Sequence, residues 1–199
     1  MPYVLVLYYS CHGAVSELAR YLARGINAVE GIEARMRTAA PVSATCEQVD
    51  PSVPETGNPY VTLEDLQHCA GLALGSPSYF GNIASPLKYF LEQTTPLWAS
   101  GALSGKPATV FTSSSSLHGG QESLLLSMMQ PLFHHGMILM GTPYTEPDLA
   151  TTTTGGTPYG VSHYAGPDNI HPVSPEEKNL CLATGRRLAE LALRLDRKG

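Results

Sequence analysis

The chain begins with an uninterrupted apolar run, Tyr3 to Tyr9, that is rich in β-branched and aromatic residues. A run of this length and composition suits a strand buried on both faces, as in the middle of a parallel sheet. Apolar side chains then recur at the spacing of one helix face, at positions 15, 18, 19, 22, 23 and 26. A buried strand followed at once by an amphipathic helix favours an α/β fold.

The alternation of strands and helices continues along the chain. Further strands are expected at residues 32–37, 70–75, 108–113 and 137–140. A short helix is expected after the cap at Thr62, and longer ones at 85–93, at 122–135 and from the capping box at 174–177 to about residue 194. Ser85 should cap the 85–93 helix with Pro86 in its first turn, and Pro131 should kink or split the 122–135 helix. Segments 39–60 and 151–172 are expected to be loops.

These elements predict a three-layer, doubly wound α/β fold. Its centre is a five-stranded parallel sheet, with helices on both faces joined by right-handed crossovers. At about 150 residues per domain, a chain of 199 residues predicts one domain with room for an elaboration. No internal repeat or linker divides it, so a single domain is expected over residues 1–199.

Charge and composition exclude several classes of function. With 12 basic and 17 acidic residues the net charge is −5, which argues against binding to nucleic acid. No apolar run is long enough to span a bilayer, and the first residues lack the features of a secretory signal. The four cysteines form no C-x-x-C pair, so reduced thiols in a cytoplasmic protein are expected. The seven histidines lack the spacing of a zinc site, so no metal is expected.

The loop after the first strand has the composition of a phosphate site. In a doubly wound sheet, ligands bind beyond the carboxyl ends of the strands. Residues 10–15 are mostly small, so their N–H groups can face an anion at the positive end of the following helix. No Lys or Arg occurs between Ser10 and Leu18, so binding would rest on main-chain dipoles and the Ser10 hydroxyl. The alternative is an ordinary strand–helix turn with Ser10 as its cap.

Other phosphate and hydrolase motifs are absent. The P-loop pattern fails because Pro107 follows Gly105-Lys106, and no G-x-G-x-x-G exists. A cysteine phosphatase loop needs an arginine six residues after Cys11, where Glu17 stands, and there is no G-x-S-x-G elbow. A phosphate site without a nucleophile indicates binding rather than hydrolysis.

Two further loops at the same edge of the sheet supply polar and aromatic groups. Residues 75–82 carry serines, glycines and Asn82 together with the flat rings of Tyr79 and Phe80. Residues 112–120 are small and polar, and alone they could be a solvated turn. Combined with the phosphate loop, they favour a planar heteroaromatic ring on a phosphorylated tail.

Six sequence blocks, spread over nearly the whole chain, carry a resemblance to a known family. They are residues 10–15, Gly75-Ser-Pro-Ser-Tyr-Phe-Gly-Asn82, Leu97-Trp-Ala-Ser-Gly-Ala-Leu103, Gly119-Gly-Gln-Glu122, His134-His-Gly136 and Gly155-Gly-Thr-Pro-Tyr-Gly160. Together they resemble the WrbA family of FMN-dependent NAD(P)H:quinone oxidoreductases, whose fold is flavodoxin-like. Residues 97–103 and 155–160 are far more specific than a lone glycine pattern.

The resemblance implies a role for each matching residue. The FMN phosphate would be held by Ser10, Cys11, His12, Gly13, Ala14 and Val15. The flavin ring would be bordered by Ser78, Tyr79, Phe80 and Gly81. Its other edge and the ribityl chain would be covered by Ser113, Ser114, Ser115, Ser116, Leu117, His118 and Gly119. His134 would act as the catalytic residue at the ring, and His12 and Trp98 would line the nicotinamide and quinone pocket.

The resemblance also implies the reaction and the assembly. NADH or NADPH would donate a hydride to FMN, and a quinone would then enter the same pocket and leave as hydroquinone. Family members are homotetramers whose sites are completed by neighbouring subunits, so the glycine-rich segment 151–166 could belong to an interface.

Three departures from the family pattern bear on that function. Ser78 and Tyr79 stand where the family has Thr-Arg, which removes a positive charge beside the flavin. Ser115 to His118 replace glycines in a loop that is one residue longer. Cys11 introduces a thiol near a helix N-terminus, either as a redox group or, as we favour, as a small buried filler. Two alternatives therefore stay open: a flavin-binding electron carrier or regulatory module with little reductase activity, and a scaffold without flavin.

Overall fold

The computed structural model describes residues 1–42 and 57–196 as alternating strands and helices. The strands are β1 (Tyr3–Tyr8), β2 (Glu33–Thr38), β3 (Gly71–Pro77), β4 (Pro107–Ser114), β5 (Ile138–Leu139) and β6 (Val161–Tyr164). The helices are α1 (Ala14–Asn27), α2 (Leu63–Gln67), α3 (Ser85–Glu92), α4 (Thr95–Ala99), α5 (Gln121–His134), α6 (Pro147–Thr151) and α7 (Pro175–Asp196).

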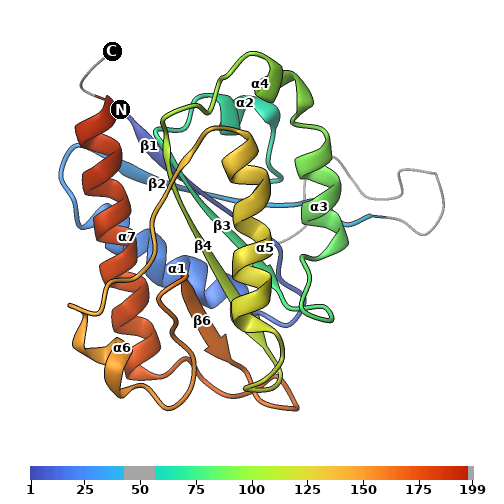
Figure 1. Cartoon of the computed structure of the whole chain (residues 1–199), viewed down its shortest axis with the longest axis vertical. Helices are drawn as coiled ribbons and strands as arrows, with labels where there is room; N and C mark the ends of the chain where they lie inside the picture. The colour runs from blue at the N-terminus through green and yellow to red at the C-terminus, as the bar shows by residue number, and fades with distance from the viewer. Residues whose placement is uncertain (43–56, 197–199) are drawn as a thin grey trace.

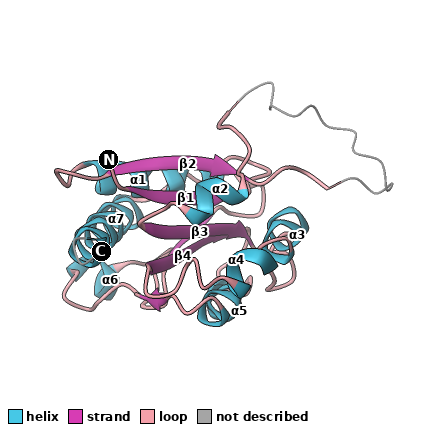
Figure 2. Ribbon diagram, turned by 90° about the horizontal axis from the view of Figure 1, so that it is seen from above, coloured by secondary structure: helices cyan, strands magenta, loops and turns pink. Residues whose placement is uncertain are grey.

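The strands form one parallel sheet in the order β2-β1-β3-β4-β5, which confirms the predicted doubly wound, flavodoxin-like α/β fold. Helices α1 and α7 cover one face, and α3, α4 and α5 cover the other (Figures 1 and 2). β1 is fully buried and supplies both cores. Val4 and Val6 pack toward α1 and α7, whereas Leu5 and Leu7 pack toward the opposite helices, as the strand period of two requires.

The fifth position of the sheet is shared by two segments, which corrects the expectation of one strand at 137–140. β5 pairs with the start of β4 through Pro107 and Ala108, while β6 pairs with residues 111–114 at its carboxyl end. The expectation of a loop throughout 151–172 is therefore wrong at β6. This strand is only four residues long and is flanked by turns, so it carries too little periodicity to detect. The five-residue helices α4 and α6 were missed for the same reason.

The predicted helix starts are confirmed in two cases and corrected in one. Thr62 accepts a hydrogen bond from the Asp65 amide (3.1 Å), and a second capping box joins Ser174 to Glu177 at the start of α7. Ser85, however, is the first helical residue, and the cap is Ala84. The Ala84 amide donates instead to the Ser76 hydroxyl (2.9 Å), which ties α3 to the end of β3.

Helix α5 continues through Pro131 to His134, so the expected split does not occur. The proline lies in the last turn, so the hydrogen bond that it cannot donate and the crowding of its ring against the preceding turn affect only the end of the helix. The predicted loop at 39–60 falls mostly on residues 43–56, which lie outside the described residues.

Helices α1 and α7 approach each other so closely that two glycines are required. A Cβ on Gly25 would lie 2.2 Å from the Leu182 carbonyl oxygen, and a Cβ on Gly185 would lie 2.2 Å from that of Leu22. Each glycine thus faces the backbone of the opposite helix, which cannot move without separating the two helices. This contact fixes α1, and with it the loop at its N-terminus.

We expect Gly185→Ala to lower the free energy of unfolding by about 1–3 kcal/mol, because a methyl group would be forced against backbone. The helix propensity of alanine exceeds that of glycine by about 1 kcal/mol, so a gain in stability would result if the helices were free to adjust. Urea denaturation followed by circular dichroism measures the difference. Glu190→Ala, on the exposed side of the same helix, is the control and should change stability little.

Candidate functional site

Three loops meet at the carboxyl ends of β1, β3 and β4 and enclose a cavity of about 660 Å³. Its size is typical of a site for a cofactor or another small molecule. The lining comprises Ser10, Cys11, His12, Ala14, Val15, Pro77, Ser78, Tyr79, Phe80, Gly81, Ser113, Ser114, Ser115, His118, Gly119, Gly120, Ser123 and Asn169. The residues expected at the switch point of the sheet therefore lie together.

The first loop presents unused N–H groups. Gly13, at φ 90°, turns the chain into α1, a conformation that favours glycine. Within the described part of the chain, no hydrogen bond to a protein acceptor uses the amides of residues 11–15. The Ser10 hydroxyl accepts from the Ser16 amide (3.3 Å), but the N-cap of α1 is Gly13, so Ser10 is not the cap and its own O–H stays available. The amides and the helix dipole together form a neutral site for an anion.

The second loop is a tight turn that exposes an aromatic ring. Tyr79 and Asn82 exchange backbone hydrogen bonds (3.0 and 2.9 Å), with Phe80 at φ 53° and Gly81 at φ 74° between them. Positive φ is rare for a bulky residue, and such strain is concentrated at functional sites. The Phe80 side chain is fully exposed beside the cavity, where it can cover a bound ring.

The second and third loops are held together by direct contacts. The Ser78 amide donates to the Ser113 carbonyl (2.9 Å), and the Ser78 hydroxyl donates to the Gly119 carbonyl (2.6 Å). A Cβ on Gly120 would lie 2.7 Å from the Cα of Gly81, so the two loops touch backbone to backbone. The aromatic turn is thereby fixed to the N-terminus of α5.

A thiol and two phenols lie at one side of the cavity. The Cys11 Sγ is 3.2 Å from the Tyr79 hydroxyl and donates to the Tyr9 hydroxyl at 3.5 Å. The hydrogen bond between Tyr79 and Cys11, together with partial burial, raises the pKa of Tyr79, so this phenol is neutral at physiological pH. Cys11 is exposed, which corrects the expectation of a small buried filler.

Most predicted site residues line this cavity, but several do not. Gly13 lines a smaller adjoining cavity of about 300 Å³, which also includes His12, Ala14 and Asn169. Ser116 and Leu117 belong to the third loop but are outside the lining of either cavity. Their side chains therefore do not border the space that the cofactor would fill.

His134 and Trp98 lie at the other end of the molecule, so neither reaches the cavity of its own chain. Gly120 at the start of α5 borders the cavity, whereas His134 ends the same helix after 14 residues, about 20 Å away. The neighbouring His135 ring contacts the Thr94 hydroxyl (2.9 Å), and the Trp98 amide donates to the Thr94 carbonyl (3.0 Å). The two predicted residues thus share one corner, where α4 adjoins the upper end of α5 (Figure 1).

Asn169 borders both cavities, and sequence reasoning missed it. It follows β6 in a segment whose glycine and proline content indicated only a loop. Asn169 has φ 56°, a left-handed conformation that asparagine tolerates better than most residues. The Pro167-Asp-Asn169 turn sequence was the available signal, but nothing in it points to the cavity.

The described residues contain no helix that could cross a membrane. Among them, no group of three or more His, Cys, Asp or Glu side chains is arranged to hold a metal ion.

Comparison with known proteins agrees with this geometry. A curated relative from Syntrophobacter fumaroxidans, named NAD(P)H dehydrogenase (quinone), is 37% identical over 201 residues and covers 98% of each chain. Among solved structures, a flavodoxin-type, WrbA-like protein from Agrobacterium tumefaciens matches with a TM-score of 0.67 at 18% identity, covering 98% of this chain and 99% of the other. A flavodoxin from the domain Archaea matches with a TM-score of 0.63 at 17% identity over 96% and 99%. At these identities the two structures support the fold alone.

Residues 2–147 match the family described as NADPH-dependent FMN reductase, which covers the first five strands and all three cavity loops. The chain therefore belongs to the NADPH-dependent FMN reductase family.

Proposed function

We propose that the chain is an FMN-dependent NAD(P)H:quinone oxidoreductase of the WrbA type, which reduces quinones to hydroquinones by two electrons. The observation that carries this proposal is the single cavity that combines unpaired amides at the start of α1 with exposed aromatic rings at 79 and 80. Family membership supports FMN and NADPH, and the full-length relative named as a quinone dehydrogenase supports the substrate.

The residues present fit FMN. A phosphate carries about −1.5 to −2 charges at neutral pH and needs several donors, which residues 11–15 and the Ser10 hydroxyl supply. The rings of Tyr79 and Phe80 border the same cavity on the second loop, suited to a planar tricyclic ring. The serines at the end of β4 offer hydroxyls between these two parts, where a polar ribityl chain would lie.

When bound, FMN supplies the two-electron chemistry, accepting a hydride from NADH or NADPH and passing it on to a quinone. The chain's own residues bind and orient the reactants. Exposed Phe80 offers a flat surface on which a nicotinamide or a quinone can stack in turn, which requires ping-pong order. His12, exposed at the junction of the two cavities, is placed to contact the entering substrate.

We further propose that His134 and Trp98 act on the cavity of a neighbouring subunit in a homotetramer. Both residues lie about a helix length from their own cavity, while Trp98 is 55% exposed and Phe133 beside His134 is 62% exposed. Exposed large apolar side chains at one corner favour contact with another chain. There His134 would donate a hydrogen bond where negative charge develops during reduction, and Trp98 would stack on the substrate.

Ala14→Asp tests the cofactor site. A carboxylate in the first turn is favourable for α1 itself, so folding should be kept. It would lie beside the phosphate, however, and we expect FMN affinity to fall by about tenfold or more through like-charge repulsion. Titration by flavin fluorescence measures this, with the exposed Ala150→Asp as matched control.

The rate of turnover tests whether the protein loaded with FMN is a quinone reductase. The protein loaded with FMN should oxidise NADH or NADPH with benzoquinone far faster than free FMN does. Flavin binding with turnover no faster than free FMN would instead indicate the electron carrier or regulatory module. No flavin binding by the unmodified protein would contradict the proposal altogether.

If each cavity is completed by Trp98 of a neighbouring subunit, two different impaired variants should restore activity to each other in a mixed oligomer. Trp98→Ala alone and Ala14→Asp alone should each reduce turnover. Mixed oligomers of the two should recover part of it, because an Ala14→Asp subunit can still supply Trp98 to the intact cavity of its partner. Co-expression with two different affinity tags isolates these oligomers, and light scattering should give the mass of four chains. A monomeric protein, or mixtures no more active than the average of the two variants, would refute it.

A further inference from the structure

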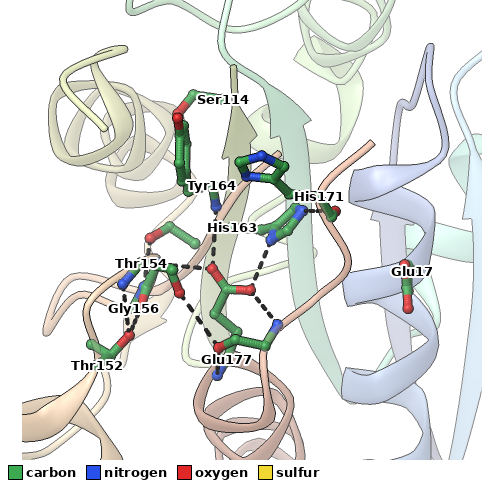
Figure 3. A network of polar contacts seen from close by, with 12 residues as sticks. Glu17, Ser114, Thr152, Thr154, Gly156, His163, Tyr164, His171 and Glu177 are labelled. Carbon is green, nitrogen blue, oxygen red and sulfur yellow. Dashed lines mark hydrogen bonds and ion pairs between the residues drawn. The ribbon is translucent and has the colours of Figure 1, made fainter. Parts of the chain in front are cut away.

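A buried ion pair lies outside the cavity, in the layer formed by β6 and α7. The His163 Nδ1 and the Glu177 Oε2 are 2.8 Å apart (Figure 3). Both side chains are about 1% exposed. No step of the proposed reaction uses these two residues. Since burying charges is costly, the arrangement needs a structural or functional reason.

Several hydrogen bonds stabilise the ionised carboxylate of Glu177. The second ring nitrogen of His163, Nε2, lies 3.2 Å from the His171 carbonyl oxygen, which can only accept. Burial alone would raise the pKa of Glu177, but hydrogen bonds from His163, from the Ser174 amide and from the Tyr164 amide outweigh it and lower the pKa. Both ring nitrogens of His163 therefore face oxygen atoms, those of the Glu177 carboxylate on one side and the His171 carbonyl on the other.

Glu177 joins segments that are distant in sequence. Its Oε1 accepts from the amides of Gly155 (2.7 Å) and Tyr164 (3.2 Å), and its Oε2 accepts from the Ser174 amide (2.8 Å) as well as from His163. The carboxylate therefore fixes β6 and the two segments that flank it to the first turn of α7 (Figure 3).

The segment held in this way, residues 165–172, runs from β6 toward α7 and borders the phosphate loop. Its first amide, that of Ala165, donates to the Ser114 carbonyl at the end of β4 (2.8 Å), and the His171 amide donates back to the Ala165 carbonyl (2.9 Å). The His171 ring packs edge-on against Tyr164, with ring centroids 5.1 Å apart. His163 thus closes the base of a loop whose far point is Asn169, beside both His12 and Ala14.

Asn169 can supply side-chain N–H donors to an anion at the phosphate loop. Among the described residues that line the large cavity there is no Lys or Arg, and Arg20 lines the smaller cavity together with Glu17, so additional donors would strengthen the binding of an anion. The side-chain amide of Asn169 has two N–H donors, is half-buried, and has no hydrogen-bond partner among the described residues. Hydrogen bonds to a charged acceptor are the stronger ones.

We propose that Asn169 is a further ligand of the FMN phosphate and that the His163–Glu177 ion pair is the positioning element that holds it there. The inference rests on the proposed function, because it assumes that FMN occupies the cavity. It extends the phosphate site from the loop after β1 to a segment about 160 residues further along the chain.

Comparison of FMN with riboflavin tests the phosphate contact, since riboflavin has the same ring and ribityl chain without the phosphate. Asn169→Ala should weaken FMN binding by about tenfold, and Asn169→Asp should weaken it further by repulsion. Neither should change riboflavin affinity by more than about twofold. Asp168→Ala, an exposed neighbour, is the control and should leave both affinities unchanged. The ³¹P resonance of bound FMN should also shift in Asn169→Ala.

Glu177→Gln tests the positioning element through non-additivity. The variant should lower FMN affinity but not riboflavin affinity, and adding Asn169→Ala should cause little further loss, because the two changes remove one contact. A role in stability alone would affect both flavins and add to the Asn169 effect. Should Glu177→Gln fail to fold, His163→Gln tests the same coupling, because it leaves the carboxylate with its three amide donors.

The outcomes separate the inference from the proposed function. If the unmodified protein binds FMN and Asn169→Ala binds it equally well, or loses FMN and riboflavin alike, the inference is wrong and the proposed function stands. If the unmodified protein binds no FMN, the proposed function fails and the inference with it.

Discussion

The whole site depends on where the backbone hydrogen bonding of β1 ends. This strand lies between two parallel neighbours, and its amide and carbonyl groups are paired along its length. Pairing stops where the chain turns at Gly13 into α1, and a helix start leaves its first amides without partners. The sheet thereby positions the unpaired amides at the start of α1, and the close contact of α1 with α7 at Gly25 and Gly185 keeps them in place.

The electrostatics of the cavity follow from this arrangement. Its donors are main-chain amides, hydroxyls, the Cys11 thiol, the imidazoles of His12 and His118 and the Asn169 carboxamide. No Lys or Arg lies among the described residues of its lining. Tyr79 is a neutral phenol hydrogen-bonded to Cys11, at the position where the pattern of the WrbA family has an arginine. The buried side chains of His163 and Glu177 lie outside the lining and shape the site only through the backbone that they fix.

The sequence was informative wherever local chemistry decides the structure. The β1 run, the stripe on α1 and the capping boxes at Thr62 and Ser174 needed only neighbouring residues to be interpreted. That the three cavity loops lie together could also be predicted, because the carboxyl ends of parallel strands lie at the same edge of a sheet.

What escaped prediction depends on contacts between distant segments. β6 is a strand because Ser114 and its neighbours offer a free edge, not because its four residues prefer that conformation. Asn169 reaches the cavity through a loop whose base is held by contacts of His163, Glu177 and Ser114, the last of them in the distant strand β4. His134 was assigned to the ring by resemblance, and one chain alone places it a helix length away.

In the proposed tetramer, the positions of Trp98 and His134 constrain how two subunits would meet. In one chain the cavity lies at the N-terminal end of α5, and Trp98 with His134 lies at the C-terminal end. A two-fold axis across α5 would set the two helices antiparallel, so that each chain's aromatic corner meets the other chain's cavity. One such interface completes two sites at once, and both contacts are identical by symmetry. A head-to-tail arrangement would satisfy the same pairs but would leave an unfilled cavity at one end unless it closed into a ring. The separation of the two groups along one rigid helix therefore favours a dimeric unit with two-fold symmetry as the building block of the proposed tetramer.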